Sequence, residues 1–141
     1  MNEGVYYHQL DAKNRMRIPA KIREEFVNGY TLTLAPGGCL AVISREESER
    51  RSAMFAKISP YDPVALEAAR SVSIWKWDAE EDNQGRILLP NSLLEYAGIE
   101  KNVVTVGVKN RLEIWSEERR EALTSKKTFE EYMALLSARL S

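Results

Sequence analysis

The sequence contains very few of the side chains that build metal sites and nucleophilic active sites. Among its 141 residues there is one cysteine, Cys39, and one histidine, His8. A single cysteine can form no disulfide within the chain, and a lone histidine leaves Cys-His and Ser-His pairs without a second partner. We expect Cys39 to be a small buried hydrophobic residue, and His8 to have a structural or surface role on a strand.

Other absences exclude further classes of protein. The sequence has no Walker loop and no Gly-x-Gly-x-x-Gly segment. No apolar run approaches the ~18 residues of a membrane span. The N-terminal residues lack the basic and apolar regions of a signal peptide. We therefore expect a cytoplasmic protein, not an enzyme, with no catalytic residue, cofactor, metal, membrane contact or small-molecule substrate.

One short motif is present twice. Residues 11–15 (Asp-Ala-Lys-Asn-Arg), followed by Ile-Pro at 18–19, return as residues 82–86 (Asp-Asn-Gln-Gly-Arg), followed by Leu-Pro at 89–90. In both copies the same interval separates Asp from Arg and Arg from Pro. An internal repeat of this kind describes the architecture, so we infer a duplicated unit whose two copies share a core.

Each copy shows the same order of predicted elements: strand, turn, strand, short helix, strand, turn, strand. In the first turn Asn14 takes the place of Gly85 in the second, and both residue types accept positive φ. Pro19 and Pro90 are suited to the start of the helices. The expected segments are strands 5–10, 15–18, 30–35 and 103–108, helices 20–26 and 91–97, and connections 36–38 and 109–110.

Further helices are predicted between the copies and after them. Ser44 with Glu47 and Thr128 with Glu131 are capping-box patterns, and Asp62 is a candidate cap. The last helix has an apolar face that needs a partner in this chain or on a neighbouring subunit. We divide the sequence into repeat 1 at 5–47, a helical linker at 48–75, repeat 2 at 76–119 and a C-terminal helical extension at 120–141.

The three tryptophans are interpreted as structural. Trp75 and Trp77 are expected on one face of the strand that leads into the second motif, and Trp115 in the last strand. Lys76, between Trp75 and Trp77, is the only basic residue that interleaves with them, whereas a stacking platform for bases combines aromatic and basic residues. A buried or interface wall is the favoured interpretation.

The formal net charge is −1, which argues against a protein that coats nucleic acid by bulk electrostatics. The local distribution is different, because residues 12–23 carry five basic side chains and no acidic one, whereas the matching residues 83–94 carry only Arg86. On a strand with a period of two, Lys13, Arg15 and Arg17 can project to the same side and form a cationic strip that can contact phosphates or guanine edges. The five basic residues are Lys13, Arg15, Arg17, Lys21 and Arg23.

The chain resembles the MraZ family of bacterial transcriptional regulators, which belongs to the SpoVT/AbrB-like superfamily. The family pattern Asp-x-x-Gly-Arg matches residues 82–86 in full, and residues 11–15 except for Asn14. The Ile-Pro and Leu-Pro pairs and the Leu-Glu-Ile-Trp segment at 112–115 fit as well. The resemblance implies an α+β fold with a mainly β core, in which two tandem repeats form a pseudo-dimeric swapped-hairpin barrel with flanking helices.

The resemblance also implies a function. MraZ-like regulators bind short G-rich direct repeats in double-stranded promoter DNA ahead of the division and cell-wall gene cluster, and form rings. A nucleoid-associated repressor of its own promoter, active as an octameric or dodecameric homo-oligomer, is therefore expected. The resemblance assigns DNA contact to Lys13 and Arg15, with Asn14 beside them, and the charge pattern adds Arg17 and Lys21. Asp11, Asp82, Gly85 and Arg86 are expected to form the structural motif, and whether Arg86 touches DNA stays open.

Two rival hypotheses remain. The same fold could serve as an antitoxin-like protein-interaction module, because the second motif is not basic and the last helix has an apolar face. An enzyme is the weakest alternative, since it would need converging carboxylates with perturbed pKa values.

Overall fold

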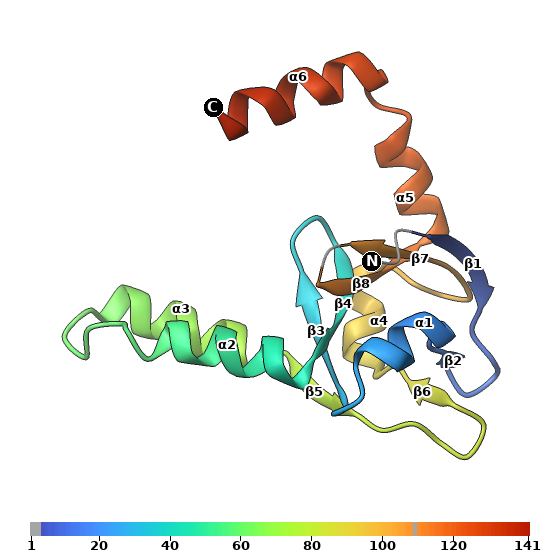
Figure 1. Ribbon diagram of the computed structural model, residues 1–141, viewed down its shortest axis with the longest axis horizontal. Coiled ribbons are helices and arrows are strands. Elements are labelled where there is room, and N and C mark those ends of the chain that lie inside the picture. Colours follow the sequence, from blue (N-terminus) through green and yellow to red (C-terminus); the bar gives the residue numbers. More distant parts are fainter. Residues whose placement is uncertain (1–3, 109) are drawn as a thin grey trace.

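The computed structural model describes residues 4–108 and 110–141. Within them the chain forms a mainly antiparallel β structure flanked by helices, as predicted for an α+β protein (Figure 1). Residue 109, which the sequence analysis placed in a connection, lies outside the described residues. The strands are β1 (Val5–Gln9), β2 (Arg15–Arg17), β3 (Tyr30–Ala35), β4 (Cys39–Ser44), β5 (Lys76–Ala79), β6 (Arg86–Leu88), β7 (Asn102–Val108) and β8 (Arg111–Ser116).

The strands form two separate sheets. Six of them lie in the order β1-β7-β8-β4-β3-β5, and β2 pairs with β6 in a ribbon of its own. Within the described residues the pairings therefore leave an open sheet with edges β1 and β5, and the expected closed barrel is not found. The reason lies in the two Asp-to-Arg turns: each turn directs the chain away from the edge strand, so β2 and β6 leave the main sheet and pair with each other.

The two repeats interlock through their strands. The pairs β1–β7, β4–β8 and β2–β6 each join the first copy of the motif region to the second, and β5, which leads into the second motif, pairs with β3. One cluster of buried side chains accordingly draws on both copies, from Leu10 and Met16 to Ile87 and Ile114. The prediction of a shared core is confirmed.

The helices begin where the sequence predicts caps. Ser44 Oγ accepts a hydrogen bond from Glu47 N at 3.0 Å, Asp62 Oδ1 accepts from Ala65 N at 3.1 Å, and Thr128 with Glu131 forms a reciprocal capping box. The helices are α1 (Ala20–Glu25), α2 (Arg45–Phe55), α3 (Pro63–Ser73), α4 (Asn91–Ala97), α5 (Glu117–Thr124) and α6 (Phe129–Leu140).

Most of the aromatic and sulfur side chains that the sequence analysis called structural pack in or against the core. Cys39 and Trp115 are buried together in a small second cluster, and burial raises the pKa of the Cys39 thiol to about 12. Trp77 is half-buried against the main core, with its ring centroid 6.2 Å from that of Trp75. Trp75, however, lies before β5 and not on it, so the two rings do not share one strand face.

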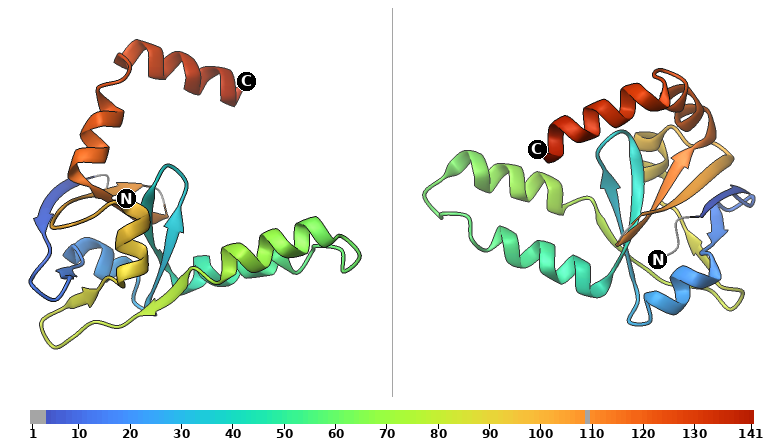
Figure 2. Two further views of the ribbon diagram at one scale, coloured as in Figure 1. Left: turned by 180° about the vertical axis from the view of Figure 1, so that it is seen from behind. Right: turned by 45° about the horizontal axis from the view of Figure 1, so that its top comes forward.

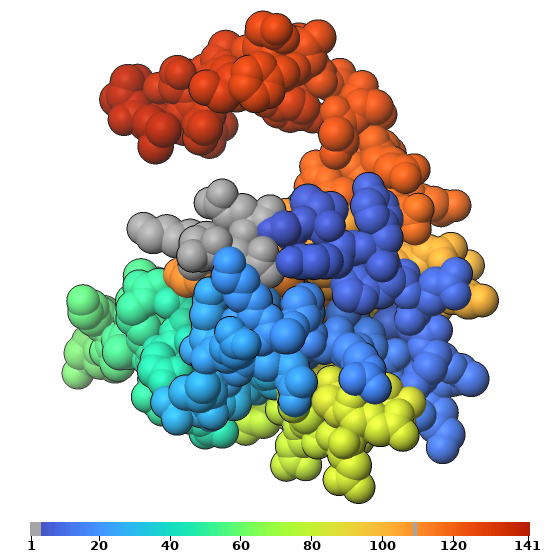
Figure 3. Space-filling view, turned by 45° about the vertical axis from the view of Figure 1, so that its right-hand side comes forward, coloured from blue at the N-terminus to red at the C-terminus, as the bar shows by residue number. Residues whose placement is uncertain are grey.

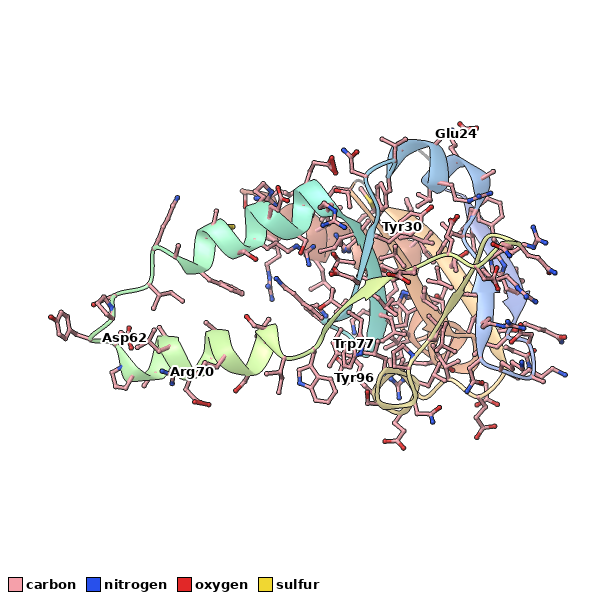
Figure 4. All side chains as sticks on the ribbon, turned by 90° about the horizontal axis from the view of Figure 1, so that it is seen from below. Glu24, Tyr30, Asp62, Arg70, Trp77 and Tyr96 are labelled. Atoms are coloured by element: carbon pink, nitrogen blue, oxygen red, sulfur yellow. The ribbon has the colours of Figure 1, made fainter. Side chains whose placement is uncertain are left out.

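Two helical arms leave the body of the molecule. Helices α2 and α3 extend on one side, and α5 with α6 forms a second arm that rises from the end of β8 and turns back over the body (Figures 1 and 2). Asp62 marks the far end of the first arm in Figure 4. Helices α3 and α6 contain no buried residue. None of the helices described is long and apolar enough to cross a membrane.

Burial beneath the β2–β6 ribbon yields a prediction about stability. Ile87, on β6, is fully buried, whereas its neighbour Leu88 is 57% exposed. We expect Ile87→Ala to lower the free energy of unfolding by about 2–5 kcal/mol, because it leaves a cavity between the repeats. The matched control Leu88→Ala should change it by no more than about 0.5 kcal/mol. Urea unfolding followed by circular dichroism measures both, and equal losses would contradict the role of the ribbon.

Candidate functional site

The two Asp-to-Arg turns have the same internal geometry. In the first, Asp11 Oδ1 accepts hydrogen bonds from the backbone N–H groups of Lys13 and Arg15, both at 2.9 Å. In the second, Asp82 Oδ1 accepts from Gln84 at 2.9 Å and from Arg86 at 3.0 Å. Each aspartate thus closes its own turn by the side-chain-to-backbone bonding that suits Asp to such positions.

A left-handed residue completes each turn. Asn14 has φ 60° and Gly85 has φ 75°, as the substitution of one for the other predicts. Asn14 is the only residue other than glycine with positive φ in the described part of the chain. Its amide also reaches the other repeat, because Nδ2 donates to Asn91 Oδ1 at 3.3 Å.

The aspartates and arginines of the two turns form one cluster of four ionic side chains. Within each turn, Arg Nε donates to Asp Oδ2 at 2.9 Å, for Arg15 with Asp11 and for Arg86 with Asp82. Between the turns, Arg86 Nη1 lies 3.4 Å from Asp11 Oδ2, and Arg15 Nη1 lies 3.6 Å from Asp82 Oδ2. The arginines therefore reach across to the opposite copy, and the two turns are held side by side.

These hydrogen bonds and ion pairs lower the pKa values of the two aspartates. Hydrogen bonds from the Arg86 and Gln84 backbone N–H groups, together with the Arg86 guanidinium, lower the pKa of Asp82 to about 2. The pKa of Asp11 is lowered in the same way, first by the Arg15 backbone N–H. Both aspartates therefore stay ionised across the neutral range and balance the two arginines beside them.

The β2–β6 ribbon has an inner and an outer face. Met16 lies opposite Ile87, and both side chains are buried. The register places Arg15 opposite Leu88 and Arg17 opposite Arg86, on the alternate positions that face outward. In Figure 3 the yellow-green atoms of the second motif region lie directly against the blue atoms of the first.

Three arginines, Arg15, Arg17 and Arg86, line one hollow beside this ribbon. The hollow has a volume of about 290 Å³. The histidine that lines it accepts from or donates to Thr105 Oγ1 through Nε2 at 2.9 Å, and burial lowers its pKa. The lining residues are His8, Gln9, Asp11, Arg15, Met16, Arg17 and Arg86.

The basic residues are distributed differently from the single strip expected on one strand. Only Arg15 and Arg17 lie on β2, because Lys13 belongs to the turn before it. Lys21 lies on α1 and is exposed. Arg23, also on α1, pairs with Glu81, with Nε 3.0 Å from Oε1. The first repeat therefore supplies cations to both turns.

Not all of the five basic residues at 12–23 lack a carboxylate partner in the structure. Among the described residues, no ion pair joins Lys13, Arg17 or Lys21 to an acidic side chain. Arg15 and Arg23 are each paired. The partner of Arg23 was missed by sequence reasoning, because Glu81 is remote in sequence and carries no local signal. In the same described part of the chain, no three His, Cys, Asp or Glu side chains are grouped to hold a metal ion.

The lowered pKa of Asp82 predicts an acid dependence of stability. Its folded pKa, about 2, lies below the ordinary value of 3.8, so its ionic contribution is present above about pH 4 and is lost as pH falls towards 2. We expect Asp82→Asn to be less stable than the wild type at pH 7, and the difference in Tm to shrink between pH 4 and pH 2. Glu49→Gln, at an exposed helix position, is the control. A difference that stays constant with pH would contradict this assignment.

Comparison with known proteins places the sequence in a family. A family model described as "MraZ protein, putative antitoxin-like" matches residues 78–139. A Transcriptional regulator MraZ from Lachnoclostridium phytofermentans is 37% identical over 119 residues, which is 84% of each chain. Its namesake from Thermoanaerobacter sp. (strain X514) is 42% identical over 115 residues, 82% of this chain and 80% of the relative. Another, from Acetivibrio thermocellus, is 36% identical over 138 residues, 94% and 96% of the two chains. With this identity over most of its length, the chain belongs to the MraZ family.

Proposed function

We propose that this protein is a sequence-specific DNA-binding transcriptional regulator. The observation that carries the proposal is that Arg15, Arg17 and Arg86 all line one hollow beside a two-stranded ribbon. A β-ribbon fits the major groove of B-DNA, and arginine is the side chain that reads guanine O6 and N7 with two hydrogen bonds. A G-rich operator suits this chemistry.

The ionic cluster does not occupy every hydrogen-bond donor of Arg15. Asp11 engages Nε of Arg15, while Nη1 lies 3.6 Å from Asp82, beyond hydrogen-bonding distance. Among the described residues, no hydrogen bond or ion pair engages Nη2 of this guanidinium, so this nitrogen is available to a base or a phosphate while the aspartates fix its position. Asn14, next to it, adds an amide, and Arg86 stands opposite Arg17 in the same ribbon. We include Arg86 in the contact surface.

The unpaired cations around the ribbon suit the sugar-phosphate backbone. Lys13 is exposed at the first turn, and Lys21 is exposed on α1. Contacts of this kind position a protein on the duplex without reading sequence, and arginine contacts to base edges then provide specificity. We therefore assign phosphate contacts to Lys13 and Lys21, and base contacts to the arginines.

Membership of the family supports a proposal for the target and direction of regulation. The relatives named above are called transcriptional regulators. We propose that this chain represses its own promoter, ahead of the division and cell-wall genes, by binding short G-rich direct repeats, and that it works in the cytoplasm on the nucleoid.

The two helical arms support assembly into a ring. Helix α6 exposes Phe129, Met133 and Leu136 on one face, and α3 exposes Val64 and Val72. Helices of this length gain most of their stability from packing, so each arm needs a partner. The arms occupy equivalent places in the two repeats but differ in sequence, which favours a head-to-tail contact between copies and closure into a ring, octameric or dodecameric. Such a ring presents its ribbons with one polarity, as direct repeats require.

An antitoxin-like interaction module is the second candidate. The specific observation in its favour is the exposed apolar face of α6, which lies within the segment matched by a family model whose description includes "antitoxin-like". Pull-down with and without residues 125–141 separates the two functions. Loss of a different protein partner while DNA binding persists would favour the module.

The first prediction of the proposed function concerns two basic residues with different tasks. Arg15→Ala should abolish the specific shift of the cognate promoter, because it removes a base-reading guanidinium. Lys21→Ala should weaken binding to all duplexes alike and reduce the slope of log K against log salt by about 0.9. Titration by fluorescence anisotropy at several salt concentrations measures both.

Gln84→Ala, at the position in the second turn that matches Lys13, is the matched control and should bind as the wild type. Circular dichroism and light scattering establish that each variant is folded and assembled. A folded Arg15→Ala that binds the promoter with unchanged affinity would show that the ribbon is not the DNA-binding surface.

The second prediction concerns the ring. Leu136→Glu places a charge on the apolar face of α6 and should reduce the oligomer to smaller species, because a buried unpaired charge is costly. Ala138→Glu introduces the same charge on the opposite face of the helix and should leave the assembly intact. Light scattering after gel filtration gives the mass. If both variants kept the wild-type mass, α6 would not be the subunit contact.

A further inference from the structure

Arg23 differs from the other cations near the ribbon because a carboxylate holds it. Arg23 Nε donates to Glu81 Oε1 at 3.0 Å, and Nη2 donates to Oε2 at 3.2 Å. This is a two-point pairing of planar groups, the strongest geometry available to an arginine and a carboxylate. The Arg23 side chain is still 45% exposed, so its position depends on the carboxylate more than on burial.

Glu81 is itself held in place by the side chain of Tyr30. The Tyr30 hydroxyl donates to Glu81 Oε1 at 2.8 Å, and Tyr30 is only 8% exposed. Burial, with a further contribution from Glu81, raises the pKa of Tyr30 to about 12, so the hydroxyl stays protonated and keeps donating. Figure 4 shows Tyr30 in the body of the molecule beside α1. The carboxylate thus has one partner in the core and one at the surface.

The pair lies against the second turn. A Cβ atom built on Gly85 would lie 3.4 Å from Cζ of Arg23 and 3.5 Å from both terminal nitrogens. Arg23 belongs to the first repeat, so the exchange of strands places a cation of one repeat on the turn of the other. Leu94 takes the place of Arg23 in the second repeat, and it is buried near Asn14. Among the described residues, only the second turn therefore has a helix arginine and its counter-ion packed against it, in addition to the Asp–Arg pair that each turn contains.

We propose that Glu81 is a positioning residue that holds Arg23 on the second turn and away from DNA phosphates, and so limits sequence-independent affinity. This inference rests on the proposed DNA-binding function. Each cation that neutralises a phosphate releases counter-ions and strengthens binding to every sequence. Arg23 lies at the edge of the ribbon, where an unpaired guanidinium would add one such contact. Glu81 keeps the second turn close to neutral, while Lys13 and Lys21 have no acidic partner in the described part of the chain.

The test measures binding to a duplex without G-rich repeats. Glu81→Gln should strengthen this binding by roughly ten-fold at low salt and steepen the slope of log K against log salt by about 0.9. Arg23→Ala, in contrast to Lys21→Ala, should leave both quantities as in the wild type. The double variant Arg23→Ala with Glu81→Gln should also behave as the wild type, because the released cation is gone.

The controls separate the role of Arg23 from a general loss of negative charge. Glu80→Gln removes a neighbouring carboxylate and should change neither the affinity nor the salt slope by the amount seen for Glu81→Gln. Tyr30→Phe keeps both charges but removes the anchoring hydrogen bond, and should shift the salt slope in the same direction by less. Thermal unfolding and light scattering verify that each variant is folded and assembled, and Arg23→Ala tests the inference even if Glu81→Gln unfolds.

Three results would overturn the inference: an Arg23→Ala variant that binds as weakly as Lys21→Ala, a folded Glu81→Gln whose salt slope is unchanged, or a double variant as tight as Glu81→Gln. Failure of the proposed function looks different, because then the wild type binds neither the promoter nor the unrelated duplex. The wild-type titrations therefore distinguish the two failures before any variant is compared.

Discussion

The reciprocal pairing of aspartate and arginine between the two turns is the constraint on which the site depends. Each aspartate closes its own turn through backbone N–H groups, and its second oxygen binds the arginine of that turn and approaches the arginine of the other. Side-chain pairs exposed to this degree contribute little to stability. Their main effect is geometric, because they fix β2 beside β6. The buried Met16 and Ile87 beneath the ribbon provide the stabilising burial.

The exchange of strands and the divergence of the two copies together explain why two similar motifs carry different numbers of basic residues at the surface. Duplication supplies two similar turns, but α1 carries the basic Lys21 and Arg23 whereas the matching positions of α4 are Ser92 and Leu94. Because the repeats interlock, Arg23 lies on the turn of the opposite copy and not on its own. The sequence places Arg23 in the basic stretch of the first repeat, whereas the fold places its side chain against the turn of the second.

The sequence predicts the local elements well and the contacts between distant segments poorly. Helix starts at Ser44, Asp62 and Thr128 were predictable because caps depend on residues three positions away. The left-handed turn at Asn14 was predictable for the same reason. The open sheet, the separate ribbon and the pairing of Arg23 with Glu81 depend on register between segments far apart in the chain, and no local pattern encodes that register. The expectation that Lys13 lies on one strand with Arg15 and Arg17 fails for the same reason. The length of β2 is set by its pairing with β6, which begins at Arg15.

Charge and assembly are linked in the proposed mechanism. The net charge is −1, and Lys13, Arg17 and Lys21 have no acidic partner among the described residues, so one subunit can neutralise few phosphates. Binding by a single subunit is then weak, and its salt dependence is shallow because few counter-ions are released. A ring whose subunits engage successive repeats converts later contacts into intramolecular ones, which raises affinity without new cations. In this proposal the apolar arms are as necessary to DNA binding as the arginines, and the Arg23–Glu81 pair would keep each single contact weak enough that operator recognition requires several subunits together.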